Sequence, residues 1–196
     1  MVSPRKGDVV LDLGSGGGVD VFRAALLVGP DGKAIGVDAT PEMIWRARET
    51  AAKYGNRYAN VAEFRLGEIE HLPIESASVD YVISNCVINL SPEKLAVLKE
   101  SFRVLKPGGV FAVADVTIAG DEGWVGSVEK GFSLDSWSAC IAGAITETEY
   151  RLLLERAGFR DIEIEHVSQP STIEGPPRLT YQISHIKARK QVTGRE

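Results

Sequence analysis

The sequence predicts an α/β fold built on a mostly parallel β-sheet. Short runs rich in β-branched residues alternate along the chain with longer amphipathic segments, which is the pattern of strands connected by helices. Turn signals that contain glycine and proline separate such segments at residues 29–32 and 106–109. A length of 196 residues fits one domain, so we expect residues 1–196 to form a single unit.

The first predicted strand ends in a cluster of glycines. Residues 9–13 (Val-Val-Leu-Asp-Leu) have the composition of a buried strand, and residues 14–18 (Gly-Ser-Gly-Gly-Gly) follow them directly. Residues 19–28 then predict a helix. A Gly-Pro-Asp-Gly turn leads from that helix into a second strand at residues 33–38.

The second predicted helix has a clear start signal. Thr40 supplies an N-cap, Pro41 suits the first helical position, and Glu42 places an acid in the first turn. We therefore expect a helix from Pro41 to Tyr54. Two further strands are predicted after it, at residues 61–66 and 79–84.

The third predicted helix leads to a fifth strand. Ser91 begins a helix over residues 92–105, which the sequence Lys-Pro-Gly-Gly at residues 106–109 should end before a strand at residues 110–116. The next segment, residues 119–144, is rich in glycine and weakly periodic. An insertion of this kind usually covers a site, and here we expect it to cover the substrate.

The last predicted helix, like the second, begins with a threonine as its N-cap. Thr146 and Glu149 form a capping-box pattern, and Gly158 marks the end of a helix over residues 146–157. Two late strands complete the pattern, at residues 160–167 and 179–187.

Composition narrows the possible partners. The chain has 22 Lys and Arg against 27 Asp and Glu, a net charge of −5, which argues against a general affinity for nucleic acid or for an anionic membrane and favours small molecules. The sequence shows neither a secretory signal nor a membrane span. We therefore expect a cytoplasmic location, in which the two cysteines are free thiols. We also expect a monomer.

The glycine cluster predicts a cofactor site. Its spacing, Asp12-x-Gly14-x-Gly16-x-Gly18, lacks the third glycine of a dinucleotide-binding loop and the lysine of a phosphate loop. An acid beside the glycines would repel a pyrophosphate, but it suits a ligand with a cationic end. S-adenosylmethionine, which carries an ammonium and a sulfonium group, fits this charge.

A second acid supports the same cofactor. Asp38 ends the second strand, where its carboxylate can accept two hydrogen bonds from a ribose diol. Met43 and the segment 67–69 would flank the adenine, although Met43 and Ile69 fit ordinary core packing equally well. The candidate cofactor-binding residues are Asp12, Gly14, Ser15, Gly16, Gly18, Asp38, Ala39, Met43, Gly67, Glu68, Ile69 and Asn85.

Together these motifs resemble the class I S-adenosylmethionine-dependent methyltransferases. The string 11–18 is similar to the first motif of that family, and the string 103–109 looks like the helix end and turn before its fifth strand. The resemblance implies a Rossmann-like three-layer α-β-α sandwich. Its sheet would have seven strands, of which only the strand at residues 179–187 would be antiparallel.

Three longer strings, residues 67–73, 84–94 and 140–144, look like the arsenite methyltransferases in particular. The resemblance implies that Cys86 and Cys140 hold trivalent arsenic while its lone pair attacks the methyl group on the sulfonium, in a detoxification reaction. It also implies an arsenical presented as a thiol conjugate, together with a thiol reductant. Considered alone, either cysteine fits a small buried hydrophobic residue.

The implied chemistry is consistent with general principles. Trivalent arsenic is soft and prefers thiolate ligands, and alignment of its lone pair with the methyl carbon would lower the barrier. The family also commonly carries an N-terminal helical cover and a further cysteine before the first strand, and residues 1–8 supply neither. We therefore expect methylarsenite to be a better substrate than arsenite.

Other functions remain open at this point. The three histidines show no metal-ligand spacing with each other or with the cysteines, so we expect no metal site. One alternative is another small-molecule methyltransferase of the same fold, in which the cysteines are incidental. The other is a truncated form that binds cofactor or arsenic without turnover.

Overall fold

A computed structural model describes residues 2–55, 60–119, 141, 143–173 and 179–192 of the chain. These residues build one sheet whose main path runs β3-β2-β1-β4-β5-β9-β7, with β6 paired to β5 and β8 paired to β9. The strands are β1 (Val9–Leu13), β2 (Lys33–Asp38), β3 (Ala62–Leu66), β4 (Val79–Asn85), β5 (Leu105–Ile118), β6 (Ile145–Thr146), β7 (Arg160–His166), β8 (Ser171–Ile173) and β9 (Leu179–Arg189).

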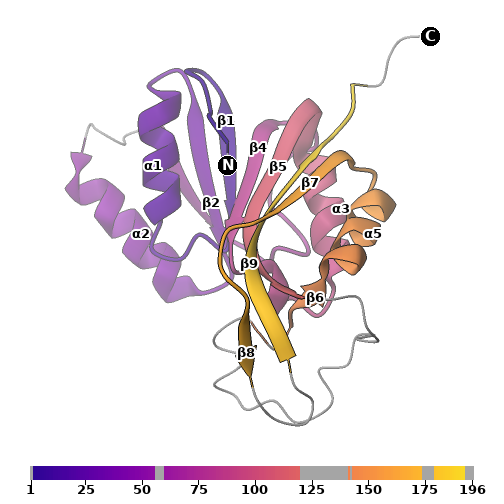
Figure 1. Cartoon of the computed structure of the whole chain (residues 1–196). Coiled ribbons are helices and arrows are strands. Elements are labelled where there is room, and N and C mark those ends of the chain that lie inside the picture. The colour runs from indigo at the N-terminus through magenta and orange to yellow at the C-terminus, as the bar shows by residue number, and fades with distance from the viewer. Residues whose placement is uncertain (1, 56–59, 120–140, 142, 174–178, 193–196) are drawn as a thin grey trace.

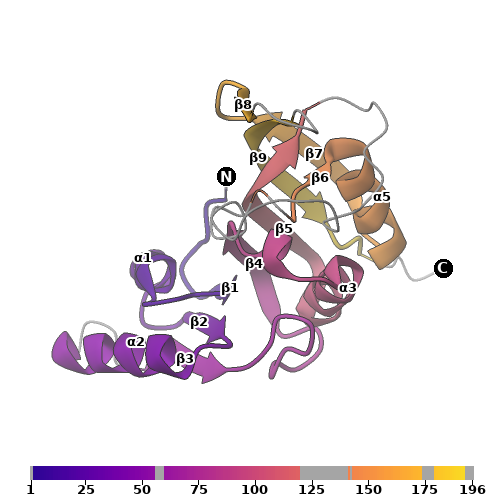
Figure 2. The same cartoon turned by 90° about the horizontal axis from the view of Figure 1, so that it is seen from below.

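Helices cover both faces of this sheet. Figures 1 and 2 show α1 and α2 against one face, and α3 and α5 against the other. The helices are α1 (Val19–Val28), α2 (Pro41–Lys53), α3 (Lys94–Val104) and α5 (Glu147–Ala157), with a short 3-10 helix, η2 (Ile88–Leu90), before α3.

The sheet topology confirms the predicted fold class. Strands β3, β2, β1, β4 and β5 pair in parallel, whereas β9 runs antiparallel to both of its main neighbours, β5 and β7. The seven-stranded main path therefore contains the single reversed strand expected at residues 179–187. The two-residue β6 and the three-residue β8 were not predicted, because strands this short leave no periodic signal.

The turn predicted at residues 106–109 is a bulge inside a strand. Strand β5 begins at Leu105, where it pairs with Val79, and the next pair is Tyr81 with Val110. Gly108 has a φ of +84° and lets the extra residues loop out of the ladder. Helix α3 is correspondingly shorter than expected, ending at Val104 and beginning at Lys94.

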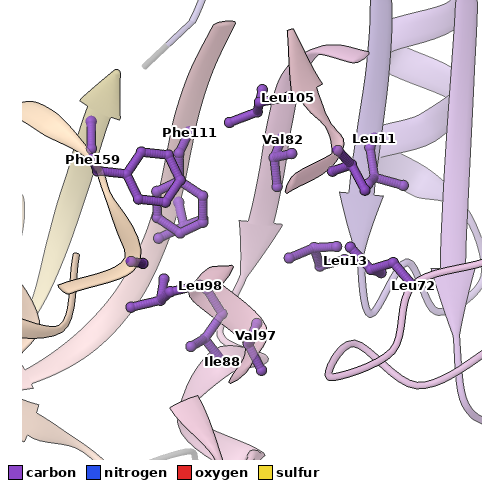
Figure 3. Close-up of a cluster of buried hydrophobic side chains, with 14 of the residues drawn as sticks. Leu11, Leu13, Leu72, Val82, Ile88, Val97, Leu98, Leu105, Phe111 and Phe159 are labelled. Carbon is purple, nitrogen blue, oxygen red and sulfur yellow. The ribbon is translucent and has the colours of Figure 1, made fainter. Parts of the chain in front are cut away.

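Two hydrophobic cores, one on each face of the sheet, hold the layers together. One packs Val10, Ala34 and Phe64 of the sheet against α1 and α2. The larger one packs Leu11, Leu13, Val82 and Phe111 against α3, α5 and Phe159. Figure 3 shows these sheet residues together with Phe159 and with Val97 and Leu98 of α3. Alternate residues of β1 thus face opposite cores, which explains why this strand is apolar almost throughout.

The ends of α5 follow the sequence signals. The Thr146 hydroxyl accepts a hydrogen bond from the main-chain N of Glu149 at 3.2 Å, and Gly158 ends the helix with a φ of +108°.

Among the described residues, no helix is long and apolar enough to cross a membrane. Of the predicted insertion at residues 119–144, only residues 119, 141, 143 and 144 belong to the described part of the chain.

Candidate functional site

Four loops surround a cavity at the carboxyl ends of the parallel strands. They follow β1, β2, β3 and β4, and the cavity between them has a volume of about 280 Å³. Open α/β sheets bind their ligands at this edge. The lining residues are Gly14, Asp38, Ala39, Thr40, Glu68, Ile69, Glu70, Val87, Leu90 and Ser91.

The glycine loop after β1 requires its glycines. Gly14, Gly16 and Gly18 all have positive φ values, of +64°, +50° and +89°. A Cβ atom at Gly14 would also overlap the side chain of Val87, a residue of the loop after β4 that lines the same cavity. The loop therefore presents its main chain to the cavity at close range, as a loop that binds a cofactor must.

Asp38 fixes the shape of this loop from the end of β2. Its Oδ2 accepts a hydrogen bond from the main-chain N of Gly16, and its Oδ1 accepts one from the main-chain N of Thr40, both at 2.8 Å. Thr40 is the N-cap of α2, but its side chain makes no capping hydrogen bond, so Asp38 holds the start of that helix. Each carboxylate oxygen keeps a second lone pair that can accept a ribose hydroxyl.

Asp12 is a buried acid beneath the glycine loop. It lies in β1 and is only 5% exposed. Burial raises the pKa of its carboxyl group well above the ordinary value, and the negative charges of Asp20 and Asp38 raise it further. A positively charged ligand group nearby would reverse this effect, because it would stabilise the carboxylate.

The loops after β3 and β4 form the other walls and are tied together. Leu72 anchors the first loop and Ile88 the second, both in the core that Figure 3 shows. Between them the Ser91 hydroxyl donates a hydrogen bond to the carboxylate of Glu70. Both partners line the cavity, so this contact sets the position of one wall relative to the other.

Cys86 begins the turn after β4 in a conformation that is rare for a side-chain residue. Its φ is +54°, and its main-chain N donates to the carbonyl oxygen of Ala114 on β5 at 2.9 Å. The side chain is half-buried. Burial raises the pKa of the thiol, and the nearby charge of Asp115 raises it further, so the neutral thiol is favoured in the free protein.

A buried polar cluster lies next to Cys86 on the face covered by α3 and α5. Asp115 and Tyr150 are each only 1% exposed, and both have a buried oxygen, Oδ2 and Oη respectively, without a hydrogen-bond partner among the described residues. Burial raises the pKa of Asp115 to about 7 and that of Tyr150 well above its ordinary value. The positive charge of Lys94, at the start of α3, acts on this cluster, since it lowers the pKa of Asp115 and so partly opposes the effect of burial.

The structure brings together part of the predicted cofactor set. Gly14, Asp38, Ala39, Glu68 and Ile69 line the cavity. Six more predicted residues lie in or beside the strand ends and loops around it but do not line it: Asp12, Ser15, Gly16, Gly18, Gly67 and Asn85. Met43 lies on the first turn of α2, is 38% exposed and does not line the cavity either. Cys140 lies outside the described residues.

Five lining residues were not predicted. Val87, Leu90 and Ser91 belong to the turn after β4, and Glu70 lies in the loop after β3, so two of the strings that carried the resemblance contain them. Thr40 was interpreted only as a helix cap. Their position at strand ends was the available signal, but a contact such as that between Glu70 and Ser91, 21 residues apart, is not visible in a sequence.

A second, larger cavity lies at the opposite end of the parallel strands, near the starts of β1, β4 and β5. Its volume is about 530 Å³, and the bulge of β5, the end of β9 and the first residues of the chain surround it. None of the predicted site residues lines it, so size alone does not identify the site. Among the described residues, no group of His, Cys, Asp and Glu side chains could hold a metal ion.

Comparison with known proteins identifies relatives of the chain. A family model described as a methyltransferase domain matches residues 4–158. An arsenite methyltransferase from Halobacterium salinarum is 52% identical over 158 residues, which cover 81% of this chain and 39% of that protein. The human arsenite methyltransferase is 38% identical over 161 residues, which cover 76% of this chain and 40% of that protein.

A solved structure similar to this chain is also an arsenic methyltransferase. The crystal structure of an arsenic(III) S-adenosylmethionine methyltransferase from Chlamydomonas reinhardtii superposes with a TM-score of 0.74 and 33% identity, and the match covers 100% of this chain and 67% of that one. The chain spans about two fifths of the length of the two curated relatives.

Proposed function

Because the chain belongs to the methyltransferase domain family and, within it, to the arsenite methyltransferases, we propose that it transfers the methyl group of S-adenosylmethionine to trivalent arsenic. The observation that carries this proposal is the turn after β4. Cys86, a thiol able to bind arsenic, begins that turn, and the next residue, Val87, forms a wall of the cofactor cavity and touches Gly14.

The residues around the cavity fit the cofactor. The glycine loop offers main-chain groups at close range, Asp38 has lone pairs for a ribose, and the buried Asp12 suits a cationic end. When bound, S-adenosylmethionine supplies an electrophilic methyl group on a sulfonium. The chain's own part is to bind the cofactor, to hold the arsenic in line with the methyl carbon and to exclude water.

Cys86 and Cys140 are the proposed arsenic ligands. Each thiol loses its proton as its sulfur replaces a thiol ligand of the incoming arsenical, and the displaced ligand leaves as the free thiol. No base is needed at the arsenic, because its attacking lone pair carries no proton. Cys140 is only three residues from Gly143, which lies against the main chain of Asn89 in the turn that begins at Cys86.

The proposal includes the physiological setting. The arsenical arrives as a thiol conjugate, a thiol reductant keeps the cysteines and the arsenic reduced, and the protein acts as a monomer. We place the reaction in the cytoplasm, where thiols stay reduced, and assign it to arsenic detoxification.

The test is speciation of arsenic after incubation with S-adenosylmethionine, glutathione and either arsenite or methylarsenite. We expect methylated products, formed faster from methylarsenite, which needs only two thiolates. Cys86→Ser and Cys140→Ser should each abolish methylation and leave the calorimetric affinity for S-adenosylmethionine unchanged. Glu93→Ala, at an exposed position just after this turn whose side chain makes no capping hydrogen bond, is the control variant for the disturbance of this loop.

Two results would contradict the proposal. Full methylation activity in both serine variants would show that the cysteines are incidental, as in a methyltransferase for another small molecule. Cofactor binding without any methylated arsenic from either arsenical would indicate a protein that binds without turnover.

A further inference from the structure

The turn formed by residues 86–91 serves both halves of the proposed site. It begins at Cys86, and three of its residues, Val87, Leu90 and Ser91, line the cofactor cavity. A movement of this turn would therefore displace the thiol and the cavity wall together. The contacts that hold this turn in place therefore also determine where the thiol lies relative to the cofactor cavity.

The conformation of the turn needs support from outside. Cys86 has a φ of +54°, a left-handed conformation that is unfavourable for a residue with a side chain. A conformation of this kind persists only where the surrounding structure fixes it. The short helix η2 (Ile88–Leu90) adds to this need, because the last carbonyl groups of a helix lack partners within it.

Lys94 supplies support for these carbonyl groups. From the first residue of α3, its Nζ donates hydrogen bonds to the main-chain oxygen of Asn89 at 3.2 Å and to that of Ser91 at 3.0 Å. Burial lowers the pKa of this ammonium group, and the charges of Asp115 on β5 and Glu149 on α5 partly oppose that effect.

Two further contacts converge on the same point. The side-chain amide of Asn89 donates to the carbonyl oxygen of Val116 on β5 at 2.7 Å. Gly143 packs so closely against the turn that a Cβ atom there would overlap the carbonyl oxygen of Asn89 and approach the Nζ of Lys94 to 3.5 Å. Lys94 thus lies where the turn, the end of β5 and the residues before β6 meet.

We propose that Lys94 is a positioning residue for methyl transfer, which fixes the turn at residues 86–91 so that the Cys86 thiol keeps a constant place relative to the cofactor loop. The inference rests on the proposed function and assigns within it a residue that touches neither cofactor nor arsenic. A displacement of about 1 Å between reacting groups can lower a rate by about 100-fold, so a clamp at this point acts on turnover more than on binding.

The test compares Lys94→Met with Lys94→Arg. Methionine keeps most of the length of the side chain but removes its charge and hydrogen bonds, whereas arginine keeps both. We expect Lys94→Met to lower kcat for methylarsenite at least 10-fold, and by a larger factor than it raises KM for methylarsenite or Kd for S-adenosylmethionine. Lys94→Arg should restore kcat to within 3-fold. Lys99→Met, an exposed lysine on the same helix, is the matched control.

Hydrogen exchange provides a second measurement that does not need turnover. In Lys94→Met, the amides of the peptide covering the turn should exchange at least 10-fold faster, while those of β1 should not change. Unchanged exchange in the turn, or an unchanged kcat, would overturn the proposal. If the original protein methylates no arsenical, the proposed function fails, and the exchange measurement still decides whether Lys94 holds the turn. If Lys94→Met does not fold, Lys94→Gln takes its place.

Discussion

At the scale of single residues, the proposed site combines groups whose protonation is displaced from its ordinary range. Asp12 and Asp115 are both buried carboxyl groups, and burial is the main cause of the raised pKa of each. They lie on different faces of the sheet, since Asp12 alternates with Leu11 and Leu13, which belong to the core beneath α3 and α5. Only Asp12 adjoins the glycine loop, so only Asp12 should respond directly to a cofactor.

The raised pKa of Asp12 leads us to expect that cofactor binding releases a proton. In the free protein its raised pKa favours the protonated carboxyl, and a cation bound nearby would favour the carboxylate. The affinity for S-adenosylmethionine should therefore increase as the pH rises through the range in which free Asp12 titrates. Calorimetry in buffers of different ionisation enthalpy measures the number of protons released.

The control for this measurement is Asp12→Asn, which cannot titrate. We expect weaker binding in this variant, because the charge that attracts the cation is lost, and an affinity that no longer rises over the same pH range. An unchanged pH dependence in Asp12→Asn would assign the released proton to another group.

At the scale of elements, the loops at the strand ends depend on one another. The glycine loop contacts the turn after β4 through Gly14 and Val87, and it contacts the end of β2 through Gly16 and Asp38. The loop after β3 joins the same assembly through Glu70 and Ser91. Four loops that are far apart in the sequence therefore form one unit. Within it, the contact between Gly14 and Val87 is so close that it leaves no room for a larger side chain at Gly14.

Gly14 and Gly17 allow a matched test of that contact. Gly14→Ala places a Cβ atom where the Val87 side chain lies and adds about 1–2 kcal/mol for a left-handed alanine. Gly17, in the same loop, has open space around it and no positive φ. We expect Gly14→Ala to lower the melting temperature and to weaken S-adenosylmethionine binding at least 10-fold, and Gly17→Ala to change neither. Equal effects at both positions would refute this account of the loop.

Elements with strong local signals could be predicted from the sequence. The strands and helices from Val9 to Thr40, the capped helix at Thr146 and the strand end at Asp38 all carried their signal in adjacent residues. The bulge at residues 106–109 could not be predicted, because the same Lys-Pro-Gly-Gly sequence suits a helix end and a bulge. Which of the two forms depends on pairing with β4.

The candidate site was predictable only where a residue's role depends on its own strand. Asp12, Gly14 and Asp38 are of this kind. Lys94 and Asp115 are not, because their contacts join α3, β5 and the turn at residues 86–91, and no spacing in the sequence connects them. A side chain such as Met43, assigned by its position early in a helix, depends on how that helix is rotated, and here it remains 38% exposed.

At the scale of the whole molecule, the polar cluster around Asp115 makes stability depend on pH. In the folded protein the pKa of Asp115 is about 7, whereas in the unfolded chain it returns to about 3.9. Between these values the folded state holds a proton that the unfolded state has lost. Stability should therefore fall as the pH rises from about 4 to about 7, and it should not fall further from this cause above that range.

Asp115→Asn tests this dependence. Two pH units within that range correspond to about 3 kcal/mol in the free energy of unfolding. Urea unfolding of the original protein at pH 5 and at pH 8 should therefore give a difference larger by about 3 kcal/mol than the same pair of measurements on Asp115→Asn. Asp12 contributes a loss of the same sign in both proteins, so the comparison isolates Asp115. Identical differences would exclude Asp115 as the titrating group.

The position of β9 in the sheet has a consequence for the order of synthesis. Strands β1 to β5 can pair with one another as they leave the ribosome, because each finds its neighbour among residues already made. Strand β7 cannot, since β9 lies between it and β5, and β9 begins only at Leu179. Until β9 emerges, β5 and β7 both present open edges. A nascent chain is thus most exposed to aggregation in the interval after β7 has been made and before β9 has emerged.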